Sequence, residues 1–158
     1  MLPAFNPALD LELNRLLKAP VAKVWRCWTE PALIEQWFAP KPVVTKDVVI
    51  DLRPGGRFFT RMVMPDGAEH PGDGCILAVD PQRLLVFTDM LEEGYRPAQA
   101  GSFGFTAWLS FAPEGDHTRY IARALHGKGE TRKQHEEMGF QDGWGTAATQ
   151  LEELARTL

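Results

Sequence analysis

The feature that most constrains the fold is a run of six strand-like segments that leads to a single long helix-like segment. β-Branched and aromatic residues are frequent in the six segments, and turn signals such as Pro54–Gly56 and Pro65–Gly67 separate them. The segments span residues 43–53, 57–64, 74–79, 84–90, 103–111 and 118–126. Strands joined by short turns, with helices kept to the ends of the chain, predict an α+β domain with an antiparallel sheet.

Three further segments precede this run. Residues 9–17 alternate leucine with polar residues at first, which predicts a half-buried strand. Two short helices follow, the first opening at Pro20 and the second holding Pro31 in its first turn and stopping at Pro40. One face of the sheet has to be covered, and the C-terminal helix is the one predicted element long enough to cover it. A twisted six- or seven-stranded sheet around that helix leaves space between the two.

The start of the C-terminal segment imitates a metal motif without completing it. The stretch beginning at His135 matches the first half of the zinc-protease motif H-E-x-x-H, but the fifth residue is Gly139 instead of histidine. The histidines fall in different predicted elements, at His70, His117, His126 and His135. Because they have no metal-ligand spacing, the sequence predicts no metal site, and we expect no cofactor.

A capping-box pattern at Thr131 and Gln134 predicts one helix over residues 131–158. A straight helix there has one broad apolar stripe, made of Phe140, Trp144, Ala147, Ala148, Leu151, Leu154, Ala155 and Leu158. His135 falls on the side of this helix opposite Trp144. The stripe therefore predicts the face that packs on the sheet.

Two charged residues and three glycines disturb this simple helix. Lys133 and Glu137 fall in the apolar stripe of a straight helix. Either the glycines kink the helix and change its register, or the two charges lie at the mouth of a cavity. Gly139, Gly143 and Gly145 each cost about 1 kcal/mol of helix propensity relative to alanine, so we expect a compensating role in packing or function.

Composition limits the classes of function. The 158 residues are enough for one domain over residues 1–158, with residues 1–8 expected to be a flexible N-terminus. A net charge of −4 without a basic face argues against nucleic acid as a partner. The apolar runs are too short to span a membrane and no signal peptide is found, so we expect a cytoplasmic protein with Cys27 and Cys75 as free thiols.

The last predicted strand has two possible registers. The favoured inward face holds Tyr120, Ala122, Ala124 and His126. The alternative turns Ile121 and Leu125 inward, and we favour the first because Arg119 and Arg123 then point to solvent. His126 is then a polar group of a pocket or an acid/base, the alternative being a hydrogen-bonded histidine at a strand end.

Two other strands predict apolar inner faces. Segment 103–111 has one aromatic and aliphatic face, consisting of Phe103, Phe105, Ala107, Leu109 and Phe111. In segment 57–63 the inward set is Phe58, Thr60 and Met62, because the other set contains the charged Arg61. Such a surface is ordinary core unless the space beside it is too large for the side chains to fill.

Several stretches taken together resemble a known family. They are "KAPVAKVWRCWTEPALIEQWFAP", "DLRPGGRF", "VDPQRLLVFTD", "HTRYIARAL" and "GFQDGWGTAATQLEELA". They are similar to the START-like, or SRPBCC, helix-grip superfamily, and within it to the branch of activator-of-heat-shock-protein-ATPase homologues (AHSA-like), over about Leu9–Leu158. The resemblance implies a seven-stranded antiparallel sheet wrapped around the C-terminal helix with a hydrophobic cavity between them. Members of the superfamily bind lipids, sterols, hormones or polyketides, and no catalytic residue set is shared.

These features predict a small cytosolic domain that binds a hydrophobic or aromatic molecule. The cavity wall is expected to consist of Trp37, Phe58, Met62, Phe105, Tyr120 and Trp144, with His126 and Glu137 adding polarity. The long loop Leu91–Ser102, which holds Tyr95 and Arg96, is expected to gate the entrance.

Two alternatives remain open at this stage. One is a polyketide-cyclase-like or hydrolase-like enzyme that uses His126 or Glu137 as general acid/base. The other is a protein-interaction module. Its partner would be a chaperone, as the branch name implies together with a role in the stress response, or a second copy of the chain in a homodimer.

Overall fold

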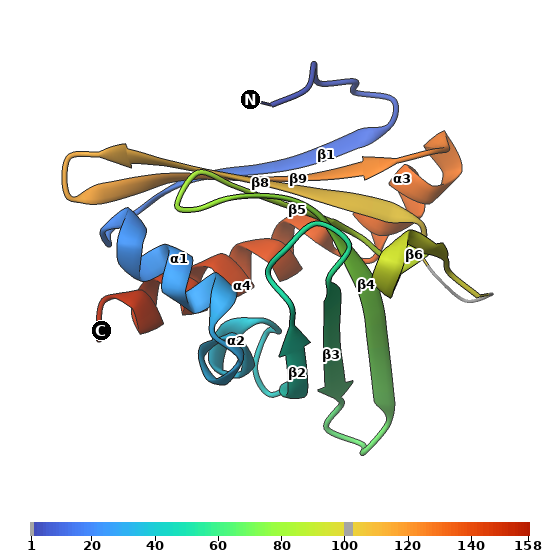
Figure 1. The fold of residues 1–158 in the computed structure, drawn as a ribbon, viewed down its shortest axis with the longest axis horizontal. Coiled ribbons are helices and arrows are strands. Elements are labelled where there is room, and N and C mark those ends of the chain that lie inside the picture. Colours follow the sequence, from blue (N-terminus) through green and yellow to red (C-terminus); the bar gives the residue numbers. More distant parts are fainter. Residues whose placement is uncertain (1, 100–102) are drawn as a thin grey trace.

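The computed structural model describes residues 2–99 and 103–158 and contains a seven-stranded antiparallel sheet in the order β1-β9-β8-β5-β4-β3-β2 (Figure 1). Its strands are β1 (Asp10–Leu17), β2 (Val44–Ile50), β3 (Arg57–Val63), β4 (Glu69–Asp80), β5 (Leu84–Thr88), β8 (Phe105–Glu114) and β9 (His117–His126). A separate small ribbon consists of β6 (Leu91–Glu92), the 3₁₀ turn η1 (Glu93–Tyr95) and β7 (Arg96–Pro97). The predicted α+β class and strand run are confirmed.

Four helices accompany the sheet within the described residues, namely α1 (Val21–Thr29), α2 (Pro31–Trp37), α3 (Gly129–Glu137) and α4 (Phe140–Ala155). Figure 1 shows α1, α2 and α4 together on one side of the sheet, and the N-terminal segment on the other side. The two short helices directly follow the first strand, as predicted, and α4 packs against both of them and against β1. This is the helix-grip arrangement expected from the sequence.

Strand registers agree with the predicted inner faces. On β9 the residues Tyr120, Ala122 and Ala124 are buried in the main core, and on β8 the same holds for Leu109 and Phe111. Side chains alternate between the two faces of a strand, so one correct position fixes the whole face. The preference for Tyr120 over Ile121 as an inward residue is therefore confirmed.

The reason given for that register is wrong in one respect, because Arg123 is not in solvent. Its side chain is buried on the outer face, where Nε donates to Glu12 Oε1 at 3.0 Å and Nη1 donates to the carbonyl of Pro3. The ring of Phe5 lies 5.2 Å from the guanidinium. Part of the N-terminal segment thus contacts the sheet, and the expected flexibility of residues 1–8, of which Met1 lies outside the described residues, stays a prediction.

The single helix predicted over residues 131–158 is wrong, since the chain forms two helices separated by Gly139. This glycine has φ 93° and ψ 40°, the left-handed conformation that ends a helix and that side chains disfavour. The capping box is also wrong, because α3 begins at Gly129 without a side-chain cap. The break changes the register, so the rings of His135 and Trp144 are 5.9 Å apart instead of on opposite sides.

The remaining glycines of α4 differ from Gly139 in their surroundings. An added Cβ at Gly145 would lie 2.9 Å from Nη2 of Arg15, whose Nη1 donates to Thr149 Oγ1 one turn further along the same helix face. At Gly143 no atom beyond the helix's own backbone and the chain neighbours lies within 4 Å of an added Cβ. Gly139 and Gly145 therefore have two different explanations, and nothing in the structure explains Gly143.

Substituting Gly139 by alanine is expected to lower the free energy of unfolding by about 1–2 kcal/mol, because alanine is strained at a left-handed φ. Gly143→Ala, four residues later, is the matched control. This substitution should raise the free energy of unfolding by about 0.5–1 kcal/mol, because alanine has the higher helix propensity and its Cβ would meet no neighbouring atom. Urea unfolding followed by circular dichroism measures both values. Equal effects of the two substitutions would show that the helix break does not depend on Gly139.

Candidate functional site

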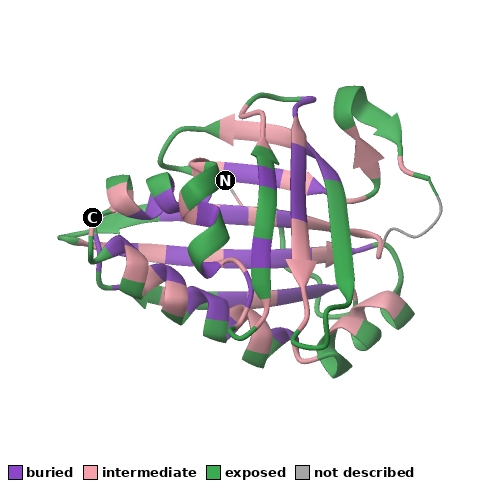
Figure 2. Cartoon of the chain, turned by 90° about the horizontal axis from the view of Figure 1, so that it is seen from below, coloured by how far each residue is buried: buried purple, intermediate pink, exposed green. Residues whose placement is uncertain are grey.

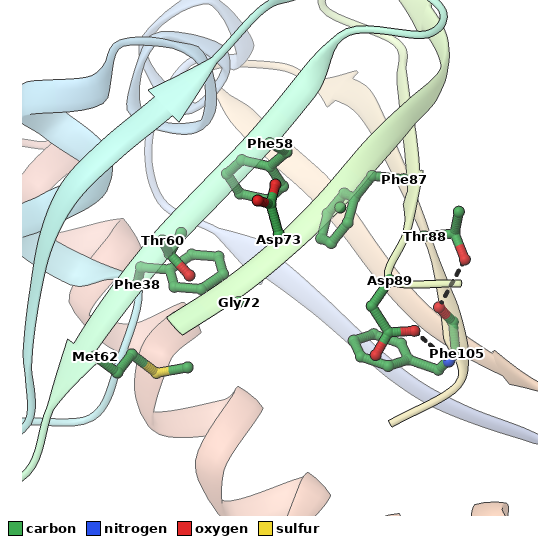
Figure 3. A pocket seen from close by; sticks show the side chains of 11 residues that line it. Phe38, Phe58, Thr60, Met62, Gly72, Asp73, Phe87, Thr88, Asp89 and Phe105 are labelled. Atoms are coloured by element: carbon green, nitrogen blue, oxygen red, sulfur yellow. Dashed lines mark hydrogen bonds between the residues drawn. The ribbon is translucent and has the colours of Figure 1, made fainter. Parts of the chain in front are cut away.

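A cavity of about 160 Å³ lies on the inner face of the sheet next to Phe38, which follows α2 (Figure 3). Its lining comes from the end of α2 and from four strands and the turn after β5, and consists of Phe38, Phe58, Thr60, Met62, Gly72, Asp73, Gly74, Phe87, Thr88, Asp89 and Phe105. An engineered cavity of about this volume holds a benzene molecule. The lining includes no residue of α4, because the inward side of that helix, including Ala148 and Leu151, is packed directly into the core.

Two glycines on one strand create the space. Gly72 and Gly74 pair with Thr60 and Phe58 across the β3–β4 ladder, so both glycines lie on the inner face. Neither has a side chain to fill the gap beside the ring of Phe58. An added Cβ at Gly72 would meet only Thr60 within 4 Å, whereas one at Gly74 would lie 2.7 Å from the carbonyl oxygen of Thr88.

The apolar wall is held in place by edge-to-face aromatic contacts. The ring centroid of Phe58 lies 4.7 Å from that of Phe87 and 5.8 Å from that of Phe38. Trp28 lies behind these rings, 5.9 Å from Phe38 and 6.0 Å from Phe87. Its indole N–H donates to the hydroxyl of Tyr120 at 3.1 Å. Because contacts of this kind stabilise a fixed arrangement, the wall is preorganised.

Most polar side chains of the lining already have protein partners. The carboxylate of Asp89 accepts hydrogen bonds from the backbone N–H groups of residues 103–105, at 2.9 to 3.2 Å. Asp73 pairs with Arg57 at 2.8 Å. The hydroxyl of Thr88 donates to the carbonyl of Phe105 and accepts from the N–H of Met90. These three side chains therefore form hydrogen bonds or ion pairs within the protein itself.

Two histidines that are nine residues apart in sequence form a pair on the far side of Phe105. His126 Nε2 and His135 Nδ1 are 2.9 Å apart, and His126 Nδ1 lies 2.8 Å from the carbonyl oxygen of Leu9. The carbonyl can only accept, so His126 Nδ1 carries the proton and neutral His126 accepts from His135 Nδ1–H. Burial lowers the pKa of His135 to about 4, and repulsion between the two rings when both carry a proton acts in the same direction.

Aromatic rings surround this pair. The ring of His135 lies 4.8 Å from Phe103 and 5.2 Å from Phe105, between centroids. From α4, Phe140 lies 5.3 Å and Trp144 lies 5.9 Å away. The sequence prediction placed His135 away from this cluster because it assumed a straight helix, and the break at Gly139 brings it in.

The predicted ligand-binding residues fall into three groups. Phe58, Met62 and Phe105 line the cavity. Trp37 and Tyr120 lie behind the wall in the core, with the Trp37 indole N–H donating to the carbonyl of Cys27. The other two, His126 and Trp144, belong to the histidine cluster and are outside the lining. Their roles in ligand binding stay predictions.

The other predicted residues lie at the surface. Glu137 is exposed at the end of α3, and its carboxylate is 3.9 Å from Nζ of Lys133. Tyr95 and Arg96 fall in η1 and β7, and the ring of Tyr95 lies against Gly55. Residues 100–102 of the expected gate loop lie outside the described residues, so gating stays a prediction. Figure 2 shows that α3 and the β6–β7 ribbon contain no buried residue.

Sequence reasoning missed several lining residues, notably Gly72, Phe38 and Phe87. The strand predicted at residues 74–79 begins instead at Glu69, which leaves Gly72 inside it. Two glycines two positions apart in a strand share a face, and this spacing was the signal available for an unfilled surface. Phe87 pairs with Ala107 on the inner face, which becomes visible only once the strand order is known.

Two further findings apply to residues 2–99 and 103–158. Within them, no group of three or more histidine, cysteine, aspartate or glutamate side chains is placed to hold a metal ion. No helix in this part of the chain has the length and apolar character needed to cross a membrane.

Comparisons with known proteins agree with the architecture. The family described as Activator of Hsp90 ATPase homolog 1-like protein matches residues 18–156. Protein NE0264 from Nitrosomonas europaea is 46% identical, with a TM-score of 0.93 over 97% of each chain. Protein Ms6760 from Mycobacterium smegmatis is 27% identical, with a TM-score of 0.78 over 95% of this chain and 92% of the other.

A more distant structure extends the likeness in fold. The AHSA1 (SPO3351) protein from Silicibacter pomeroyi is 23% identical, with a TM-score of 0.69 over 94% of this chain and 99% of the other. None of the curated proteins searched matches the chain. The comparisons therefore concern family and fold, and the site has to be interpreted from its own chemistry.

Proposed function

Because the chain belongs to the family of Activator of Hsp90 ATPase homolog 1-like proteins, we propose that it binds a compact apolar or aromatic molecule in the cavity next to Phe38. The family and fold support a small ligand-binding or chaperone-associated domain in general. The observation that supports ligand binding in this chain is the 160 Å³ cavity, which the inward-facing Gly72 and Gly74 leave unfilled between phenylalanine rings.

The size of the cavity limits the part of a ligand that it can enclose to about one aromatic ring. Burial of roughly 150 Å² of apolar ligand surface is worth about 4 kcal/mol at about 25 cal/mol per Å². This corresponds to a dissociation constant of about 1 mM for a single-ring probe. A natural ligand of higher affinity would extend beyond the cavity.

The polar groups of the lining support binding over catalysis. Asp73, Thr88 and Asp89 are engaged by Arg57 and by backbone groups, and a general acid/base needs a free position beside the reacting atom. His126 and Glu137, the acid/base candidates from the sequence, are outside the lining. We therefore rank the cyclase-like or hydrolase-like alternative below ligand binding.

Substituting Gly72 by leucine is expected to weaken the binding of toluene at least tenfold. An added Cβ there has only two atoms of Thr60 within 4 Å, Oγ1 at 3.5 Å and the carbonyl oxygen at 3.9 Å, so a larger side chain extends into the cavity. NMR titration of ¹⁵N-labelled protein with toluene measures the affinity, and circular dichroism checks the fold.

The matched control is His70→Leu, which adds the same side chain to the same face of β4. His70 pairs with Met62, two positions along the strand from Gly72, and is exposed outside the lining. Toluene affinity close to that of the unmodified protein is expected for this variant. If Gly72→Leu binds toluene as well as His70→Leu does, the cavity is not the ligand site.

The remaining functional predictions have no specific structural observation in their favour. Chaperone contact, a homodimer and a cytoplasmic location stay predictions from the sequence and its resemblance. Chaperone association agrees with the description of the family, and the toluene experiment leaves it open.

A further inference from the structure

Thr60 places a hydroxyl group in the otherwise apolar wall of the cavity. The residue is 5% exposed and lies on the inner face of β3 between Phe58 and Met62 (Figure 3). Within residues 2–99 and 103–158, no hydrogen bond reaches its Oγ1. Thr60 borders the open space of the cavity. It differs in this from Thr45, whose unpartnered Oγ1 is completely enclosed in protein.

The other polar side chains of the lining have used their hydrogen-bonding capacity. Asp89 accepts four hydrogen bonds from three backbone N–H groups. Asp73, between Gly72 and Gly74, has its side chain on the outer face of β4, where it is paired with Arg57. Thr88 donates once and accepts twice, from the N–H of Met90 and from the hydroxyl of Thr106. An unpaired hydroxyl in an apolar wall is unfavourable. Thr60 is therefore the described lining side chain with hydrogen-bonding capacity to spare.

The geometry at Gly72 shows where a partner for this hydroxyl would lie. The position of the missing Cβ of Gly72 is 3.5 Å from Thr60 Oγ1. A ligand atom in van der Waals contact with Gly72 on this side of the strand can therefore lie within hydrogen-bond reach of Thr60 Oγ1. On the same face of the sheet, the rings of Phe58 and Phe87 provide a surface for an aromatic group.

Charge determines which polar group fits there. The lining contains no lysine, arginine or histidine, and its inward carboxylate, Asp89, is already held by backbone N–H groups. A ligand carboxylate would be repelled and would find no cation, whereas a neutral hydroxyl can donate to or accept from Thr60. We infer that Thr60 selects a compact aromatic alcohol of the phenol class over the hydrocarbon of the same shape, an inference that rests on the proposed ligand site.

The test compares phenol with toluene, which differ in shape very little. Thr60→Val replaces the hydroxyl by a methyl group of similar size and should weaken phenol binding about 3- to 10-fold. Toluene binding should change by less than about twofold, because no hydrogen bond is involved. Thr60→Ser keeps the hydroxyl and is the conservative control, expected to retain the preference for phenol. NMR titrations of the three proteins with both probes give the affinities.

The outcomes for Thr60 and for the cavity are separable. The role of Thr60 is overturned if Thr60→Val weakens the binding of phenol and toluene equally, or if it leaves the affinity for phenol unchanged. In either case, toluene binding to the unmodified protein and its loss in Gly72→Leu still support the cavity as the ligand site. Absence of binding of either probe to the unmodified protein overturns both proposals. A selective loss of phenol affinity in Thr60→Val that Thr60→Ser does not show supports the inference.

Discussion

Asp89→Ala is expected to lower the free energy of unfolding by about 3–5 kcal/mol. The carboxylate of Asp89 accepts hydrogen bonds from the consecutive backbone N–H groups of Phe103, Gly104 and Phe105. Hydrogen bonds to a charged group contribute about 1.5–3 kcal/mol each, and three that share one carboxylate add up to less than their separate sum. Urea unfolding followed by tryptophan fluorescence measures the change.

The same substitution is expected to weaken toluene binding, because Asp89 fixes the start of β8. Phe105 is the first residue of that strand and lines the cavity. Without the carboxylate, three partly buried N–H groups lose their acceptor and the segment before β8 loses its fixed position. The expected result is therefore a combined loss of stability and of affinity.

Asp66→Ala is the matched control for this prediction. The carboxylate of Asp66 accepts one exposed hydrogen bond, from the N–H of Ala68 at 2.9 Å in the turn between β3 and β4. Its removal should cost about 1 kcal/mol or less, with toluene affinity unchanged. A cost for Asp89→Ala no larger than this would show that the three backbone contacts do not hold the strand.

Acidification from pH 7 to about pH 4 is expected to remove about 2 kcal/mol of stability through His135 alone. Burial lowers the pKa of this residue in the folded chain to about 4, from 6.5. Below pH 6.5 the unfolded chain binds a proton that the folded chain does not bind, so unfolding becomes easier as the pH falls. The full shift corresponds to about 3 kcal/mol, and solvent screening of the partly exposed ring reduces this to about 2 kcal/mol.

His135→Gln separates this effect from the titration of carboxylates. Glutamine does not titrate, and its amide can still donate to His126 Nε2, where His135 Nδ1–H donates at 2.9 Å. The difference in the free energy of unfolding between the unmodified protein and this variant should fall by about 2 kcal/mol from pH 7 to pH 4. Parallel pH curves for His135→Gln and the unmodified protein would contradict the prediction.

Local periodicity carried most of the information on the fold. Alternation in β3 and β9 predicted the inward faces correctly, because each strand's buried side chains repeat every two residues whatever its partner strand. The apolar stripe from Phe140 to Ala155 likewise predicted which side of α4 packs in the core. Proline was a local signal for the second short helix, which has Pro31 in its first turn and ends before Pro40.

Backbone conformation at single residues was not predictable in the same way. Gly139, Gly143 and Gly145 are equivalent as sequence, since each lowers helix propensity by the same amount. Only the structure separates them, because it gives Gly139 a left-handed φ and places Arg15 across Gly145. The same break decides where His135 lies, and therefore that it pairs with His126.

The sequence by itself determined the α+β class, the inner faces of the strands and the core side of α4, because these depend on the spacing of residues close together in the chain. The tertiary structure decided where open space remains and which polar groups meet. The register between β3 and β4 sets Gly72 and Gly74 opposite Thr60 and Phe58, and thereby leaves the cavity unfilled. Strand register and the meeting of polar groups depend on contacts between distant segments, and for this reason the cavity and the histidine pair could not be read from local spacing alone.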